Sequence, residues 1–211
     1  PNRSPLEKYW SFDPDVIFLN HGSFGATPNQ VMEEQARIRA HLESDPVRFF
    51  EREAFGLMNE ASEKLSDFLN ADPYGMTFCQ NATSGVNTVL RSLTLNRGDE
   101  IIIPNHSYQA CWNAIDFVAS RWGAKVVVVD LPFRCNSEEE IIEPLLGAIT
   151  PRTVLAMIDT VTSPTGLRMP FEKLVNEFQL RGVDVLLDAA HGPGIVPMDL
   201  AKLDVAWVTG N

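Results

Sequence analysis

The chain has 211 residues, 45% of them hydrophobic, and a formal net charge of -11. It can therefore bury a sizeable core, whereas it lacks the clustered Lys and Arg that nucleic-acid binding requires. Its three cysteines form no CxxC pair, which argues against a disulfide framework or a structural zinc site. No apolar run approaches the roughly 20 residues of a membrane helix, and the N-terminus lacks the apolar segment of a signal peptide. We expect a cytoplasmic protein with no nucleic-acid or membrane partner.

The first 70 residues predict an N-terminal segment of mixed character. Residues 16–20 (VIFLN) read as a short strand or extended segment, which runs into the turn NHGSFGATP. Apolar residues at helical spacing then predict two helices, over residues 28–44 and 49–70.

Residues 71–211 predict alternating strands and helices. The predicted strands cover residues 75–80, 100–104, 125–131, 153–159, 184–188 and 204–208. The predicted helices cover residues 84–93, 108–121, 138–149 and 171–180. Apolar strands that alternate with helices are typical of the α/β class, with a mostly parallel sheet covered by helices on both faces. Ligands of such sheets gather at the carboxyl ends of the strands, so the functional residues are sought there.

The stretch QNATSGVN follows the first of these strands and opens a helix. Thr83, Ser84 and Gly85 would place hydroxyls and free backbone N–H groups at the positive end of the helix dipole, which suits a phosphate. The stretch is neither a Walker loop nor a GxGxxG motif. A plain helix N-cap is the alternative, because Thr and Ser favour that position.

Two more strand ends carry polar residues. In PNHSYQACW, His106 and Tyr108 follow a strand, where a flat aromatic ring could lie against a planar ligand or simply pack within its loop. In DTVTSPTG, residues 159–166, the polar residues also suit a tight turn with a purely structural role.

The stretch VLLDAAHGPG ends a buried strand in a carboxylate, Asp188, followed by His191. A buried carboxylate is costly unless it meets a cation or several hydrogen-bond donors. Asp188 could instead cap nearby backbone N–H groups, or pair with His191 as two ligands of a metal. Two ligands are too few for a metal site, and no HxH or HExxH pattern is present, so we expect no metal. Together, a phosphate site, an aromatic plane and an aspartate for a ring cation describe a site for pyridoxal 5'-phosphate (PLP), whose protonated pyridine nitrogen Asp188 would bind.

The motifs NHGSFGATP, NATSGVNTVLRSL, TSPTG, DAAHGPG and VTGN resemble, in that order, the class V aminotransferase family of fold-type-I PLP enzymes. The likeness is strongest to its isopenicillin N epimerase-like and C–S lyase branch. It covers the chain from about residue 16 onward and implies that residues 71–211 are part of the PLP-binding large domain.

The resemblance also implies roles for individual residues. Those implied to bind the cofactor are Thr83 and Ser84 at the phosphate, Tyr108 against the ring (with His106 as the alternative), Ser163, Asp188 at the ring nitrogen, His191 at the phenolic oxygen, and Asn211. Asp188 and His191 are also the implied catalytic residues. On the substrate side, the resemblance implies Asn20 and His21, and Arg48 for a substrate carboxylate.

In this family a lysine that forms the Schiff base with PLP follows the TGN motif within a few residues. We therefore expect this lysine just beyond Asn211, and interpret the chain as the N-terminal half of a longer homodimeric enzyme, without the C-terminal small domain. The implied function is a PLP-dependent reaction of an amino-acid substrate through an external aldimine, of the isopenicillin N epimerase type. The alternatives are a C–S lyase or cysteine-desulfurase-type activity, or a non-catalytic PLP-fold binding protein. A metal-dependent hydrolase would use Asp188 and His191 but would leave Thr83 and Tyr108 unexplained.

Overall fold

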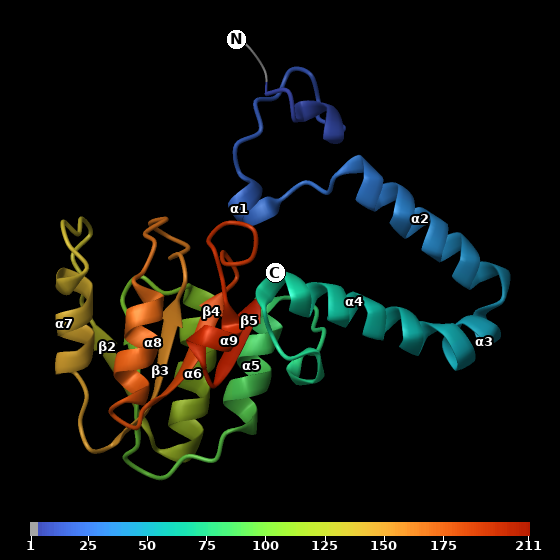
Figure 1. Ribbon diagram of the computed structural model, residues 1–211. Helices are drawn as coiled ribbons and strands as arrows, with labels where there is room; N and C mark the ends of the chain where they lie inside the picture. Colours follow the sequence, from blue (N-terminus) through green and yellow to red (C-terminus); the bar gives the residue numbers. More distant parts are fainter. Residues whose placement is uncertain (1–3) are drawn as a thin grey trace. The chain divides into compact units, whose positions relative to one another are not determined.

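The computed structural model describes residues 4–211, which fall into two compact units that meet in sequence between Lys64 and Leu65. Figure 1 shows the helices of the first unit and the strands and helices of the second. Each unit is described by itself. None of the helices within residues 4–211 is long and apolar enough to cross a membrane.

The N-terminal unit is helical. Its elements are η1 (Glu7–Tyr9), α1 (His21–Phe24), α2 (Asn29–Ser44), α3 (Pro46–Arg48), η2 (Phe49–Glu53) and α4 (Ala54–Leu69), the last of which continues into the second unit. Residues 16–20 form no strand. Both long helices are confirmed, although the second begins with a π-helical turn, η2, in place of a regular α-helical one.

The C-terminal unit is built on a five-stranded sheet in the order β2-β1-β3-β4-β5, in which every neighbouring pair is parallel. The strands are β1 (Glu100–Pro104), β2 (Lys125–Val129), β3 (Thr153–Asp159), β4 (Asp184–Ala189) and β5 (Trp207–Gly210). The predicted parallel α/β sheet is therefore confirmed.

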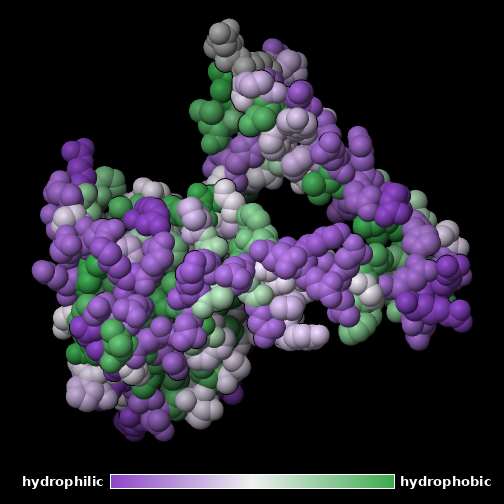
Figure 2. Space-filling view, in the orientation of Figure 1, coloured by the Kyte–Doolittle hydropathy of each residue, from purple (hydrophilic) through white to green (hydrophobic). Residues whose placement is uncertain are grey.

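The helices of this unit cover the sheet on both faces, as Figure 1 shows. The covering helices are α5 (Ala82–Ser92), α6 (Gln109–Trp122), α7 (Glu139–Gly147), α8 (Phe171–Gln179) and α9 (Leu200–Leu203), and the short η3 (Pro73–Gly75) precedes them. One buried cluster joins alternate strand residues to α7 and α8, and a second joins the other strand residues to α5 and α6. Over α7 and α8 the outer surface is largely hydrophilic in Figure 2, because the apolar side of each helix faces the sheet.

Two strand predictions need correction. The strand expected over residues 75–80 is wrong, because η3 ends there and the following chain is irregular. Thr77, Phe78 and Cys79 are all exposed, so this segment lacks the burial that stabilises a strand. The last strand covers Trp207–Gly210 in place of residues 204–208, because Asp204 adopts a left-handed conformation that ends α9.

An ion pair links the buried Glu100 of β1 to the exposed Arg152, just before β3, at the amino end of the sheet. Glu100 is only 4% exposed and accepts hydrogen bonds from the Thr150 hydroxyl and from Arg152, whose Nη2 lies at 2.7 Å and Nε at 3.1 Å. The Thr150 hydrogen bond, followed by that of Arg152, lowers the pKa of Glu100. Because the ionised form is favoured in the folded state, the carboxylate stabilises the fold above its unfolded pKa near 4.5, and this contribution is lost as the pH falls.

We predict that Glu100→Gln lowers the melting temperature of the full-length protein at pH 7. The difference from the wild type should shrink as the pH falls below about 4.5, where the wild-type carboxyl also becomes protonated. Thermal unfolding at about pH 3.5 and at about pH 8, on either side of the ordinary carboxyl pKa, measures this. Glu172→Gln, which removes an exposed partner of Arg168, is the control and should have little effect. An equal loss at both ends of the pH range would contradict the prediction.

Candidate functional site

The carboxyl ends of three strands place polar side chains on one face of the sheet. Asp159 of β3 is in register with Asp188 of β4, which is in register with Thr209 of β5. In-register residues of parallel strands point to the same face. The residues two positions earlier on these strands pack in the cluster formed by α5 and α6, so all three polar side chains face these helices.

Asp188 is 4% exposed and is held by two hydrogen bonds. Its Oδ1 accepts the N–H of Ala190 at 3.0 Å, and its Oδ2 accepts the thiol of Cys111 on α6 at 3.3 Å. Within residues 4–211 no Lys, Arg or His forms an ion pair with it. A buried carboxylate with so few donors is suited to a cation from a bound group.

Asp159 lies beside Asp188 and is 3% exposed. Its Oδ2 accepts the hydroxyl of Ser107 at 2.6 Å. Burial, and then the negative charge of Asp188, raises the pKa of Asp159 to about 8, against the opposing effect of the Ser107 hydrogen bond. Sequence reasoning did not include Asp159, Ser107 or Cys111 among the site residues. The available signal was that two apolar strands, TVLAMID and DVLLD, both end in aspartate.

The first turn of α5 carries Thr83 and Ser84, the residues predicted to bind a phosphate. Asn81 is the N-cap residue, and its Oδ1 accepts the N–H of Ser84 at 2.9 Å. The N–H of Ala82 donates to Oδ1 of Asn211 at 3.0 Å, whereas residues 4–211 offer no acceptor to the N–H of Thr83. Because Asn81 is the cap, the alternative in which Thr83 or Ser84 serves as a plain N-cap is wrong, and both half-buried residues lie in the first turn.

Close packing brings strand β5 against this turn. A Cβ atom added at Gly85 would lie 2.9 Å from Cγ2 of Thr209, so only glycine allows the observed approach of α5 to β5. The Thr209 hydroxyl is buried and has no hydrogen-bond partner within the described residues. An unsatisfied buried hydroxyl beside a helix N-terminus fits a site for an anionic group such as the phosphate of PLP.

The other predicted cofactor residues lie in loops at the same carboxyl edge. Tyr108 is the N-cap of α6 and is 46% exposed, whereas His106 is buried and its Nδ1 is hydrogen-bonded to the Thr165 hydroxyl at 3.2 Å. This difference favours Tyr108 as the ring available to a ligand. Ser163 is exposed in the loop after β3, and His191 is half-buried in the turn after β4.

The predicted substrate residues belong to the N-terminal unit. The His21 ring packs edge-on against Phe18 and Trp10, at centroid distances of 4.8 and 5.5 Å. Arg48 donates from Nε to Glu53 at 2.7 Å, so a substrate carboxylate would compete with Glu53 for it. Asn20 is exposed just before α1. The substrate roles of Asn20, His21 and Arg48 stay predictions.

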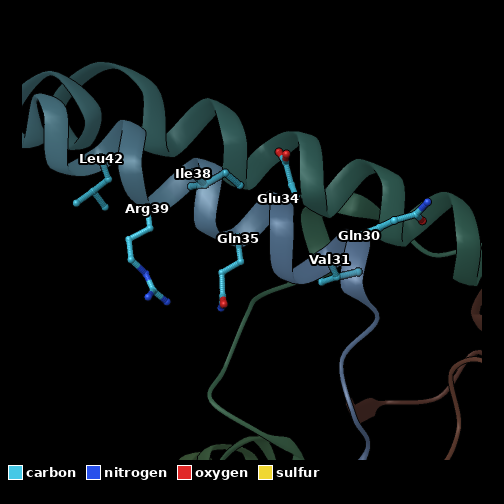
Figure 3. Close-up of a pocket in the computed structure, with 7 residues that line it drawn as sticks. All are labelled: Gln30, Val31, Glu34, Gln35, Ile38, Arg39 and Leu42. Carbon is cyan, nitrogen blue, oxygen red and sulfur yellow. The ribbon is translucent and has the colours of Figure 1, made fainter. Parts of the chain in front are cut away.

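A groove of about 610 Å³ runs along α2 in the N-terminal unit (Figure 3). Its side chains all come from this one helix and offer no nucleophile or buried acid: Gln30, Val31, Glu34, Gln35, Ile38, Arg39 and Leu42. Residues 4–211 contain no group of three His, Cys, Asp or Glu side chains that could hold a metal ion. Within this part of the chain, Asp188 and His191 therefore have no third metal ligand.

Residues 17–210 match the family model of the class V aminotransferases, and the chain belongs to this family. The isopenicillin N epimerase of Streptomyces clavuligerus is 34% identical over 202 residues, which cover 94% of this chain and 50% of that protein. A probable chloroplastic L-cysteine desulfhydrase of Arabidopsis thaliana is 29% identical over 224 residues, which cover 99% of this chain and 47% of that protein. The chain thus spans about half the length of the curated relatives it matches.

Solved structures share the fold. A variant of C-DES with glycine covalently linked to its PLP cofactor superimposes with a TM-score of 0.87 at 20% identity, covering 99% of this chain and 55% of that one. The cysteine desulfurase CsdA of Escherichia coli gives a TM-score of 0.82 at 23% identity, covering 98% and 53%. The family and fold predicted from the sequence are confirmed, and the cofactor predicted with them, PLP, is the one in the C-DES structure.

We predict that Gly85→Ala destabilises the full-length protein by about 1–3 kcal/mol, because the added methyl group forces α5 away from Thr209. Gly147→Ala is the matched control, since Gly147 lies in α7 and an added Cβ would meet nothing within 4 Å. There alanine should be neutral or stabilise the helix by up to about 1 kcal/mol. Denaturant unfolding of both variants measures the difference, and equal stability would contradict the close packing.

Proposed function

We propose that this chain provides the cofactor-binding sheet of a PLP-dependent enzyme that acts on an amino acid at Cα or at a C–S bond. The single observation that carries the proposal is Asp188, a buried carboxylate with two weakly acidic donors and no cation among the described residues. A protonated pyridine ring supplies the missing positive charge, and PLP then provides an electron sink for carbanions.

The other residues of the carboxyl edge support the same proposal through their positions. The first turn of α5 offers Thr83 and Ser84 to a phosphate, where the helix dipole and backbone N–H groups favour an anion. Asn211 binds the N–H of Ala82 and so ties the end of β5 to this turn. Tyr108, which is partly exposed at the start of α6, is proposed to lie against the ring.

Two loop residues complete the proposed cofactor contacts. His191, half-buried after β4, is proposed to hydrogen-bond the phenolic oxygen, and Ser163 to contact the cofactor from the loop after β3. Asn20, His21 and Arg48 are proposed to face the substrate, with Arg48 exchanging Glu53 for the carboxylate of an amino acid.

Proton exchange at Cα is the reaction that we place first. An isopenicillin N epimerase is the more similar of the two relatives described above, at 34% identity. Epimerisation removes and returns a proton at Cα, so it needs the electron sink but no leaving group. The second candidate is C–S cleavage, which adds a sulfur leaving group at Cβ and is supported by the similarity to L-cysteine desulfhydrases.

We also propose a cytoplasmic homodimer. Helices of the N-terminal unit leave large apolar side chains exposed, which another subunit could cover. Their exposed fractions lie between 49% and 78%: Val31, Met32, Phe50, Phe55 and Met58.

We predict that the full-length protein with added PLP has a yellow absorbance band that borohydride abolishes, and that Asp188→Asn lowers kcat/KM roughly 10- to 100-fold. The amide cannot stabilise a protonated ring nitrogen. Turnover is measured as exchange of the Cα proton of an amino acid in deuterated water and as sulfide release from L-cysteine. Asp184→Asn, an exposed change at the other end of β4, is the control. Absence of the band would contradict PLP binding, and full activity of Asp188→Asn would contradict the role of Asp188.

A further inference from the structure

The side chains around Asp188 include a second carboxyl that the proposed function does not use. Asp159 and Asp188 occupy in-register positions at the ends of adjacent strands and point to the same face of the sheet. Both are at least 96% buried. Two ionised carboxylates placed side by side in such surroundings repel each other strongly, so one of them keeps a proton.

Burial and charge decide which carboxyl keeps it. Asp188 accepts the N–H of Ala190 and the thiol of Cys111. Asp159 accepts the hydroxyl of Ser107 at 2.6 Å, and this hydrogen bond and one from the backbone both lower its pKa. Burial, and then the charge of Asp188, outweigh them and raise the pKa of Asp159 to about 8, so Asp159 is the member that keeps the proton.

Among the residues that the structure describes, the groups that face the pair leave this assignment unchanged. The titratable group on α6 that faces the pair is Cys111, and burial, followed by the charge of Asp188, raises the pKa of its thiol, so it stays a neutral donor. On β5 the in-register neighbour of Asp188 is the neutral Thr209. In the turn after β1, Ser107 is neutral and His106 is hydrogen-bonded to Thr165.

We propose that Asp159 is a positioning residue of the cofactor site: it holds one proton beside Asp188 in the cofactor-free protein and releases it when a positive charge pairs with Asp188. The inference rests on the proposed function. No bond other than O–H is broken, and the proton passes to solvent or to the incoming ring nitrogen. The reason is electrostatic, because a cation at Asp188 cancels the charge that opposes ionisation of Asp159. Binding of the cofactor is thus linked to the protonation of Asp159.

The first test uses the full-length, cofactor-free protein. The unfolded Asp159 loses its proton above its ordinary pKa of 3.8, whereas the folded one keeps it up to about pH 8. The folded state therefore binds more protons between these values, and stability falls as the pH rises. Asp159→Asn, which is neutral at every pH, should lack this fall. The unfolding constant of the wild type, divided by that of Asp159→Asn, should grow by about tenfold per pH unit as the pH rises and level off near pH 8.

Two variants control this test. Asp184→Asn removes an exposed acid from the same strand and should keep the wild-type pH dependence. Ser107→Ala removes the donor that opposes the raised pKa of Asp159, so the fall in stability should continue to higher pH than in the wild type. A pH dependence of Asp159→Asn identical to that of the wild type would overturn the proposal, as would a Ser107→Ala profile that levels off with the wild type.

The second test measures protons released when PLP binds. Calorimetric titration at pH 7 in buffers of different ionisation enthalpy gives this number, and the wild type should release up to one proton more than Asp159→Asn. Equal proton release by the wild type and Asp159→Asn, with normal PLP binding by both, would overturn only the link between cofactor binding and the protonation of Asp159. Failure of the wild type to bind PLP would overturn the proposed function instead, and the pH dependence of the cofactor-free protein would still report the protonation of Asp159.

Discussion

A strand that is buried on both faces can carry a polar side chain only where it ends. The interior residues of β3 and β4 are almost all buried and apolar, since each face of the sheet packs against helices. Polar groups in these positions would lose their hydration without compensation. The constraint collects Asp159, Asp188 and Thr209 at one edge of the sheet, and the parallel direction of the strands makes this the same edge for all three.

The same edge is completed by a helix that packs unusually close to the sheet. Gly85 allows α5 to approach Thr209, and Asn211 accepts a hydrogen bond from the first turn of this helix. The positive end of the α5 dipole and the carboxylate of Asp188 therefore belong to one rigid framework of strands and helices. Such a framework can hold a ligand that carries an anion at one end and a cation at the other, and PLP is a ligand of this kind.

Local pattern was sufficient to predict the parallel sheet, four of its strands to within two residues, and the strand-end position of Asp188. Contacts between segments that are distant in the sequence could not be predicted from local pattern. The pairing of Asp159 with Asp188 depends on the register of β3 against β4, and the thiol contact of Cys111 depends on how α6 lies on the sheet. The strand predicted over residues 75–80 was wrong because its apolar residues suggested a strand on local pattern alone. In the structure no neighbouring strand pairs with this segment, and most of its side chains are exposed.

The two proposed reactions share their first chemical requirement and differ in the second. Removal of a proton from Cα is helped by a protonated ring nitrogen, which we propose that Asp188 and its in-register neighbour Asp159 control together. Cleavage of a C–S bond needs, in addition, a sulfur at Cβ, which leaves as sulfide. In this proposal the carboxyl edge of the sheet serves what both reactions have in common, and selection between them falls to residues that reach Cβ of the substrate. Of the predicted substrate residues of the N-terminal unit, Asn20 and His21 are the candidates for that task. Arg48 binds a carboxylate, that of Glu53, which is the chemistry that recognition of an amino acid requires in either reaction.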